Sequence, residues 1–168
     1  FLDLKSAAVF YDRIMTIEDI AELQLSHRNV VRLEARPSSP DGNLEISTKT
    51  LVRTALRLRP DRLIIGEVRG AETLDMLSAM NTGHDGSMST IHANSARDAL
   101  RRVESLVLQH AANWSREIVQ DHVASSINAI VHVARNIDGS RFVKEVLLVS
   151  REGLNEVVLD GRVLREVW

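Results

Sequence analysis

Residues 59–94 read RPDRLIIGEVRGAETLDMLSAMNTGHDGSMSTIHAN, and this stretch decides the fold class. Its apolar run Leu63–Ile65 is typical of a parallel strand that is covered on both faces. A helical pattern then occupies residues 70–82, and residues 87–91 have the composition of another strand. A strand, a helix and a second strand in this order predict part of an α/β fold with a parallel sheet. The helix residues predicted to face inward are Leu74, Leu77 and Met80, and Gly83 is placed to end the helix.

The same alternation extends upstream. Short apolar runs at residues 13–17 and 30–33 predict two further strands. A helix is predicted to begin at a Ser47 or Thr48 cap and to be closed by Pro60. Its predicted inward residues are Leu51, Val52, Ala55 and Leu56.

The pattern changes near Trp114, which, like Trp168, is expected to pack in the core or at an interface and not to contact a ligand. Before Trp114, a helix is predicted to start at Ser95 with Asp98 at the capping-box position, and after it one more helix covers residues 117–126. The remaining chain consists of short apolar runs separated by glycine-containing turns, which predicts antiparallel β structure. These runs lie at residues 130–133, 142–149, 157–159 and 163–167.

The sequence therefore predicts an α/β region over residues 1–112 and a helix with a β-rich tail over residues 113–168. The 168 residues are 44% hydrophobic and 26% charged, which is ordinary for a globular protein. A net charge of −2 and six aromatic residues, counted as Phe, Trp and Tyr, argue against a nucleic-acid partner. The absence of cysteine excludes disulfides and thiolate metal sites, and no apolar run reaches the ~20 residues that span a bilayer.

Glu67 is the first candidate for chemistry, because it follows the apolar run Leu63–Ile65 and Gly66. Open α/β sheets bind ligands in the crevice beyond the carboxyl ends of their strands. A glutamate in this place can orient a water for attack on a γ-phosphate. The alternative is a solvated glutamate at the end of a strand, without a role in chemistry.

Two histidines, His84 and His92, flank the predicted strand at residues 87–91. Eight residues of extended chain at ~3.3 Å each separate them by about 26 Å, so they cannot share a metal ion unless the backbone reverses. One imidazole near a phosphate is chemically reasonable, because it can donate a hydrogen bond to an oxyanion. The alternative for each is an ordinary surface or packed histidine.

Acidic residues follow the strand predicted at residues 13–17. Carboxylates of Glu18, Asp19 and Glu22 at this place can hold Mg²⁺ through water, because this ion keeps much of its hydration shell. A charged turn is the alternative.

Arginines also surround the Glu67 segment, either to balance phosphate charge or as a basic surface at a helix end. They are Arg53, Arg57, Arg59, Arg62 and Arg69.

Three segments resemble the Asp box, the Walker B segment and the His box of the type II/IV secretion ATPases. They are RIMTIEDIAEL (13–23), LVRTALRLRPDRLIIGEVRG (51–70) and TGHDGSMSTIHANS (82–95). The likeness covers roughly residues 1–109 and is closest to the tight-adherence (Flp) pilus ATPases, with the conjugation and type IV secretion ATPases more distant. Three boxes in the right order make coincidence very improbable.

The resemblance implies a RecA-like P-loop NTPase core in a homo-hexameric motor that uses ATP and Mg²⁺. Such a motor is cytoplasmic, lies against the bacterial inner membrane, and works on the membrane-embedded platform of a pilus or secretion system. Its catalytic residues would be Glu67, which activates water, His92, which approaches the γ-phosphate, and Glu18. Glu18 and Glu67 would hold the metal through water, and Gly66 replaces the aspartate usual in P-loop enzymes. The implied nucleotide-binding residues are Glu22, His84, Arg53, Arg57 and Arg69, the arginines being candidates for phosphate or intersubunit contacts.

One expected motif does not occur. A phosphate-binding loop needs G-x-x-x-x-G-K-[ST], whose backbone N–H groups and lysine hold the phosphates, and the chain contains no Gly-Lys pair. In the family this loop lies directly before the residues that match Phe1, and residues 2–9 match the segment that comes after the loop. We expect the chain to be a truncated core without the P-loop strand, and to bind and hydrolyse MgATP poorly by itself. The alternative function is a degenerate assembly subunit that works without nucleotide.

Overall fold

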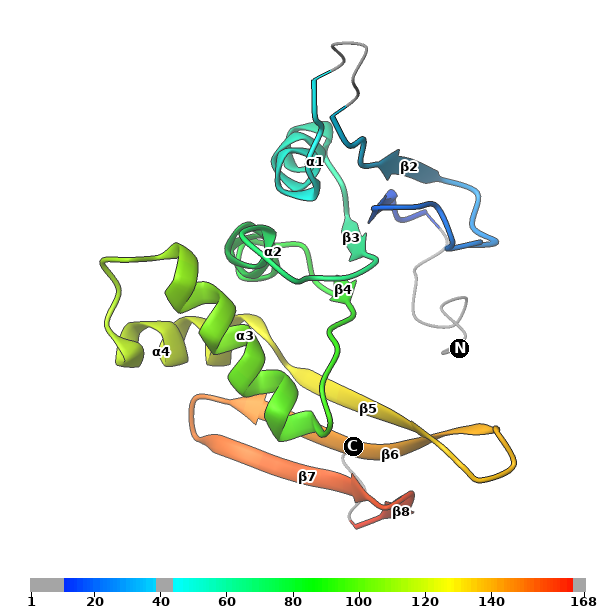
Figure 1. The fold of residues 1–168 in the computed structure, drawn as a ribbon, viewed down its shortest axis with the longest axis vertical. Helices are drawn as coiled ribbons and strands as arrows, with labels where there is room; N and C mark the ends of the chain where they lie inside the picture. The colour runs from blue at the N-terminus through cyan, green and yellow to red at the C-terminus, as the bar shows by residue number, and fades with distance from the viewer. Residues whose placement is uncertain (1–10, 39–43, 165–168) are drawn as a thin grey trace. The chain divides into compact units, whose positions relative to one another are not determined.

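The computed structural model describes residues 11–38 and 44–164. It divides into two compact units, Phe1–Ile91 and His92–Trp168, and Figure 1 labels the helices and strands of each. We call them the parallel unit and the antiparallel unit, after their sheets. Residues 2–9, which match the segment that follows the phosphate-binding loop in the family, lie outside the described residues.

The parallel unit contains a four-stranded sheet in the order β2-β1-β3-β4, in which all neighbouring strands run parallel. The two central strands are nearly inaccessible to solvent, because β1 is buried along its whole length and β3 at three of its four residues. This matches the continuous apolar runs of the sequence. The strands are β1 (Ile14–Glu18), β2 (Val30–Glu34), β3 (Arg62–Ile65) and β4 (Met88–Ser89).

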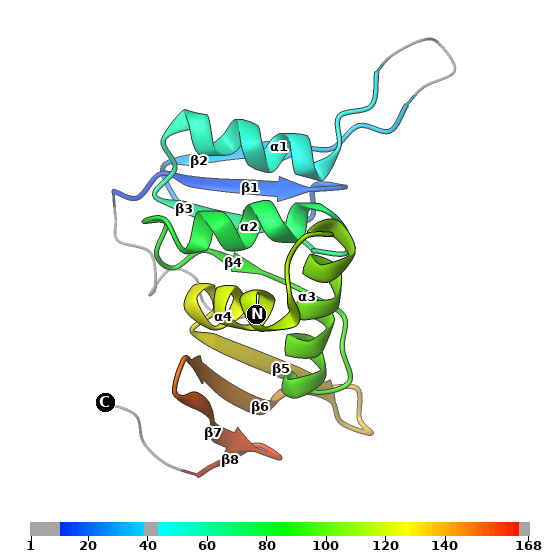
Figure 2. The same cartoon turned by 90° about the vertical axis from the view of Figure 1, so that its left-hand side faces the viewer.

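Two helices lie side by side over one face of this sheet, as Figures 1 and 2 show. They are α1 (Thr48–Ala55), which continues into the 3-10 turn η1 (Leu56–Leu58), and α2 (Glu72–Met80). Ser47 caps α1 by accepting a hydrogen bond from the backbone N of Thr50 at 3.3 Å. Except for Val68 in the loop after β3, the largest fully buried side chains of this unit come from these strands and helices, and each apolar one contributes about 1.5–3 kcal/mol of burial energy. The largest are Met15, Ile17, Leu63, Ile65, Leu77 and Val52.

Helix α2 differs from its prediction in length and orientation. It begins at Glu72, two residues later than expected, because the preceding backbone forms hydrogen bonds to the Glu72 carboxylate. Met76, Leu77 and Ala79 are buried, whereas the expected inward residues Leu74 and Met80 are only partly buried. Apolar residues cover more than one face of this helix, so their spacing does not fix its rotation.

The antiparallel unit contains a meander in the order β5-β6-β7-β8, as predicted for the β-rich tail. Helix α3 packs on β5 and β6, and α4 packs on α3 and β6. The units divide before α3, earlier than the expected change at residue 112, because α3 contacts the meander. The elements are α3 (Ala96–His110), α4 (Arg116–Ser126), β5 (Ala129–Arg135), β6 (Arg141–Ser150), β7 (Gly153–Leu159) and β8 (Arg162–Val163).

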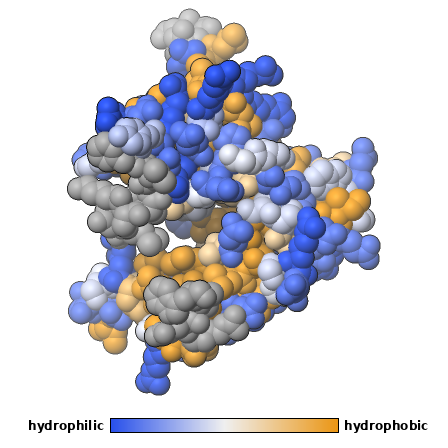
Figure 3. Space-filling model, turned by 180° about the vertical axis from the view of Figure 1, so that it is seen from behind, coloured by the Kyte–Doolittle hydropathy of each residue, from blue (hydrophilic) through white to orange (hydrophobic). Residues whose placement is uncertain are grey.

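The two faces of the meander differ. Leu147 on the helix-covered face is 1% exposed, whereas Val131 and Val133 on the other face are 39% and 49% exposed. Figure 3 shows hydrophobic residues gathered over the surface that this sheet forms. The helices therefore cover only one side of an apolar sheet.

Trp114 packs within this unit, in line with the expectation that it has a structural role. Its ring meets that of His122 edge to face, with centroids 5.2 Å apart. Burial lowers the pKa of His122, because the charged imidazolium loses solvation there. Trp168, which was expected to be similar, lies outside the described residues. No helix in the described ranges is both long and apolar enough to cross a membrane.

Candidate functional site

The carboxyl ends of β1 and β3 bring two sequence-predicted glutamates to the same edge of the sheet. Ile17 is paired with Ile65 in parallel register, so Glu18 lies beside Gly66 and Glu67 follows directly. Glu18 is 5% exposed, and Glu67 is partly buried. The two central strands thus deliver carboxylates to the place where open α/β sheets bind ligands.

Gly66 provides the space that Glu18 occupies. The backbone N of Gly66 donates to the carbonyl of Ile17 at 2.8 Å. A Cβ at position 66 would lie only 3.1 Å from Cγ of Glu18. The absence of a side chain at Gly66, where P-loop enzymes usually have an aspartate, therefore leaves room for the side chain of Glu18 beside the end of β3.

The Glu18 carboxylate also holds the turn that follows β1. Its Oε1 accepts hydrogen bonds from the backbone N of Glu22 and of Leu23, both at 3.0 Å. The side chain of Glu22 is exposed. Of the predicted acidic residues, Glu18 thus stabilises the turn after β1 through these hydrogen bonds, whereas the side chain of Glu22 faces solvent.

Asp19 joins three segments at this edge, although the family resemblance gave it no role among the site residues. Its Oδ1 accepts from Thr48 Oγ1 at 2.8 Å, at the start of α1. Its Oδ2 forms an ion pair with Nη2 of Arg69, just after β3. The predicted phosphate-binding residue Arg69 therefore pairs with a carboxylate in this structure. Asp19 belongs to the quoted acidic segment, but no spacing rule would have identified its two partners.

The loop after β3 is fixed on both flanks of Glu67. The carbonyl of Gly66 accepts a hydrogen bond from Thr90 Oγ1, and the backbone N of Val68 donates to the carbonyl of Thr90 at 3.0 Å. Thr90 lies just past β4, which pairs with β3. The loop after β3 is therefore held by the residue that follows the neighbouring strand.

Two predicted site residues lie at the opposite edge of the sheet. Each helix starts at the carboxyl edge and runs back, so Arg57 in η1 precedes the start of β3 and His84 precedes the start of β4. His84 Nδ1 lies 3.1 Å from the carbonyl O of Ala79, at the end of α2. Parallel β-α-β connections thus separate both side chains from Glu67. This separation does not support a position of His84 in the same pocket as Glu67.

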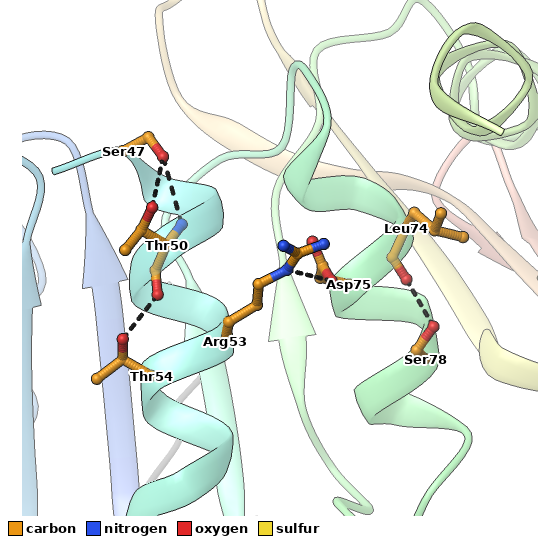
Figure 4. A network of polar contacts seen from close by, with 7 residues as sticks. All are labelled: Ser47, Thr50, Arg53, Thr54, Leu74, Asp75 and Ser78. Carbon is orange, nitrogen blue, oxygen red and sulfur yellow. Dashed lines mark hydrogen bonds and ion pairs between the residues drawn. The ribbon is translucent and has the colours of Figure 1, made fainter. Parts of the chain in front are cut away.

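Arg53 connects the two helices. Its Nε lies 2.9 Å from Oδ1 of Asp75 in α2, and Figure 4 shows the two side chains meeting between the helices. The Arg53 side chain is 61% exposed, so this ion pair is screened by water and contributes little to stability. An intersubunit contact remains the prediction for Arg53 and Arg57.

His92 is the first residue of the antiparallel unit and is exposed. Its predicted approach to a γ-phosphate stays a prediction.

The described residues contain no group of three or more His, Asp or Glu side chains arranged to hold a metal ion. Mg²⁺ commonly binds through one or two carboxylates, with waters and substrate phosphates completing its coordination. The oxygen donors Glu18 and Glu67 fit that water-mediated mode and not a cage made by protein alone.

The sequence profile of the family described as "Type II/IV secretion system protein" matches residues 4–157. The chain belongs to the type II/IV secretion system protein family. Family membership agrees with the resemblance found in the three boxes, while the tight-adherence subfamily stays a prediction.

Relatives of this secretion family protein include conjugal transfer and type IV secretion proteins. A putative conjugal transfer protein of Mycobacterium tuberculosis is 40% identical over 140 residues, covering 83% of this chain and 39% of the relative. The VirB11 protein of the Brucella abortus type IV secretion system is 34% identical over 143 residues, covering 82% and 40%. The chain thus spans about two fifths of the length of these relatives.

A solved structure shares the fold of this secretion family protein. The VirB11 ATPase of the Brucella suis type IV secretion system, crystallised with sulphate, aligns with a TM-score of 0.74 at 32% identity, covering 86% of this chain and 42% of that one. The mixed α/β fold with a parallel sheet is therefore that of a secretion ATPase. The RecA-like P-loop core and its truncation remain predictions.

Proposed function

We propose that the chain is the C-terminal part of a homo-hexameric motor that hydrolyses ATP and powers pilus assembly or protein secretion. The placement of Glu18 and Glu67 at the adjoining carboxyl ends of β1 and β3 carries this proposal. Membership of a family with a solved ATPase supports the reaction type. The names of the relatives favour a secretion or conjugation apparatus over a tight-adherence pilus.

In the proposed reaction, Glu67 orients the water that attacks the γ-phosphate of ATP, and the fixed loop around it limits its movement. Glu18 and Glu67 contact the hydrated Mg²⁺ that accompanies the nucleotide, and His92 adds a hydrogen bond to the phosphate. Glu22, which is exposed beside them, is kept as a nucleotide-binding candidate. The motor would work in the cytoplasm against inner-membrane platform proteins, with no nucleic-acid partner.

The test is Glu67→Gln in the full-length protein. Because the amide cannot activate water, we expect kcat for ATP hydrolysis to fall at least about a hundredfold, with nucleotide affinity changed less than about threefold. Glu34→Gln is the matched control, since Glu34 is an exposed glutamate at the end of β2 on the same edge. Unchanged turnover in Glu67→Gln would refute the proposal.

The alternative is a degenerate assembly subunit that keeps the ring without turnover. Hexamers of the unmodified full-length protein that assemble without nucleotide and do not hydrolyse ATP would favour this alternative. The retained Glu18, Glu67 and His92 favour the enzyme, because a subunit freed from catalysis does not need them.

A further inference from the structure

The loop that carries Glu67 is held by a buried carboxylate to which the proposed function gives no role. Glu72, the first residue of α2, is 8% exposed. Its Oε1 accepts hydrogen bonds from the backbone N of Arg69 and of Gly70, both at 2.7 Å. These are the two residues that lead from the Glu67 loop into the helix.

The sequence around Glu72 is fitted to this contact. A Cβ at position 70 would lie 3.1 Å from Oε2 of Glu72, so Gly70 leaves room for the carboxylate. Thr73 Oγ1 donates to the carbonyl of Gly70 at 2.8 Å, which fixes the next peptide, between Gly70 and Ala71. A carboxylate at the start of a helix also interacts favourably with the helix dipole.

Glu72 completes the restraint of the loop. Thr90 fixes the backbone at Gly66 and Val68, and Glu72 fixes residues 69 and 70. Position 67 therefore lies in a loop whose backbone is held at residues 66 and 68 by Thr90 and at residues 69 and 70 by the buried carboxylate of Glu72. The short distances and the double acceptance are typical of strong charge-assisted hydrogen bonds.

We propose that Glu72 is a positioning residue for Glu67, holding the loop so that the Glu67 carboxylate keeps its direction at the sheet edge. This inference rests on the proposed function, because it assigns Glu72 to the same reaction. Glu72 contacts backbone and not substrate, so its loss lowers turnover while substrate binding is retained. Misplacement of a reacting group by about 1 Å can reduce rates about a hundredfold.

The experiment compares Glu72→Ala, Glu72→Gln and the control Glu117→Ala in the full-length protein. Glu117 is the matched control because it is an exposed glutamate in the first turn of α4. Steady-state ATP hydrolysis gives kcat and KM, and mass spectrometry follows amide hydrogen exchange in the peptide that spans residues 66–72.

For Glu72→Ala we expect kcat to fall at least about tenfold, KM to stay within about threefold, and exchange at residues 69 and 70 to accelerate at least about tenfold. Glu72→Gln keeps an oxygen that can accept the hydrogen bonds from the backbone N of Arg69 and Gly70. The kcat of this variant should therefore lie within about threefold of the value of the unmodified protein. Glu117→Ala should change neither quantity.

If Glu72→Ala fails to fold, Gly70→Ala decides, because its Cβ would lie 3.1 Å from Oε2 of the same carboxylate and would shift it by a few tenths of an ångström. We expect a lower kcat with an unchanged KM and faster exchange. Unchanged turnover in these variants, or a lower kcat with unchanged exchange, overturns the role of Glu72. Full activity in Glu67→Gln overturns the proposed function instead, whereas inactive Glu67→Gln beside fully active Glu72→Ala overturns this inference alone.

Discussion

Gly66 and Glu18 form a pair in which the smaller residue makes the position of the larger one possible. The close approach of Glu18 Cγ to the site of a Cβ at position 66 makes any side chain there costly. The Glu18 carboxylate in turn fixes the turn at Glu22 and Leu23. A substitution at position 66 thus disturbs the adjacent strand as well as its own.

Gly66→Ala tests this coupling. We expect it to lower the free energy of unfolding by about 1–3 kcal/mol, as overpacking does, measured by urea denaturation. In the Glu18→Ala background the clash is absent, so the same substitution should cost less than about 0.5 kcal/mol. Additive effects of the two substitutions would contradict the contact.

At the residue scale, the sequence predicted the sheet-edge position of Glu18 and Glu67 but not their hydrogen-bond partners. Strand ends are visible as apolar runs that stop at a charged residue. Thr48, which binds Asp19, and Thr90, which binds the backbone of Gly66, lie far along the chain from these partners, and only the folded backbone brings them close. His84 was assigned to the same pocket because distance along the chain does not reveal that a helix returns to the opposite edge.

At the element scale, β6 provides the cap of a helix. Glu145 Oε2 accepts from the backbone N of Ala96 at the start of α3, at 2.7 Å. Ser95 was predicted as the cap, and its Oγ accepts from the N of Asp98 at 3.0 Å. The meander and the helix are therefore joined by a partly buried carboxylate that no local pattern predicts.

Glu145→Ala should remove the hydrogen bond between β6 and the start of α3 and lower the free energy of unfolding by about 1.5–3 kcal/mol, because hydrogen bonds to charged groups have this magnitude. Chemical denaturation followed by circular dichroism measures the change. Glu117→Ala, at an exposed first-turn glutamate of α4, is the control and should stay within about 0.5 kcal/mol. Equal effects in the two variants would show that the Ala96 contact is unimportant.

The elements themselves were largely predictable, with errors in their ends. Continuous apolar runs identified β1 and β3, and capping serines identified α1 and α3. β7 begins at Gly153, earlier than the expected run at residues 157–159, because its first residues include Asn155 and Glu156 and do not form an apolar run. Pairing with β6 overrides the composition of such residues.

At the scale of the whole molecule, the chain contains the carboxylates that we propose for catalysis but no G-x-x-x-x-G-K-[ST] segment to bind phosphates. We therefore predict that the 168-residue chain by itself binds MgATP more weakly than about 1 mM, because backbone N–H groups of that segment supply the main contacts. Titration with a fluorescent ATP analogue measures the affinity. Micromolar binding would show that other residues suffice.

The strand order of the parallel unit also determines when it can form during synthesis. Of the strands that the structure describes in this sheet, β1 precedes the others in the chain and is wholly buried in the fold, yet its partner β3 follows only after β2 and α1. The β5–β6 hairpin, by contrast, joins neighbours in the chain. Contacts between distant residues form slowly, so β1 of a nascent chain lacks its partner β3 until β3 has left the ribosome. The protein is most exposed to aggregation during this interval, before β3 is available.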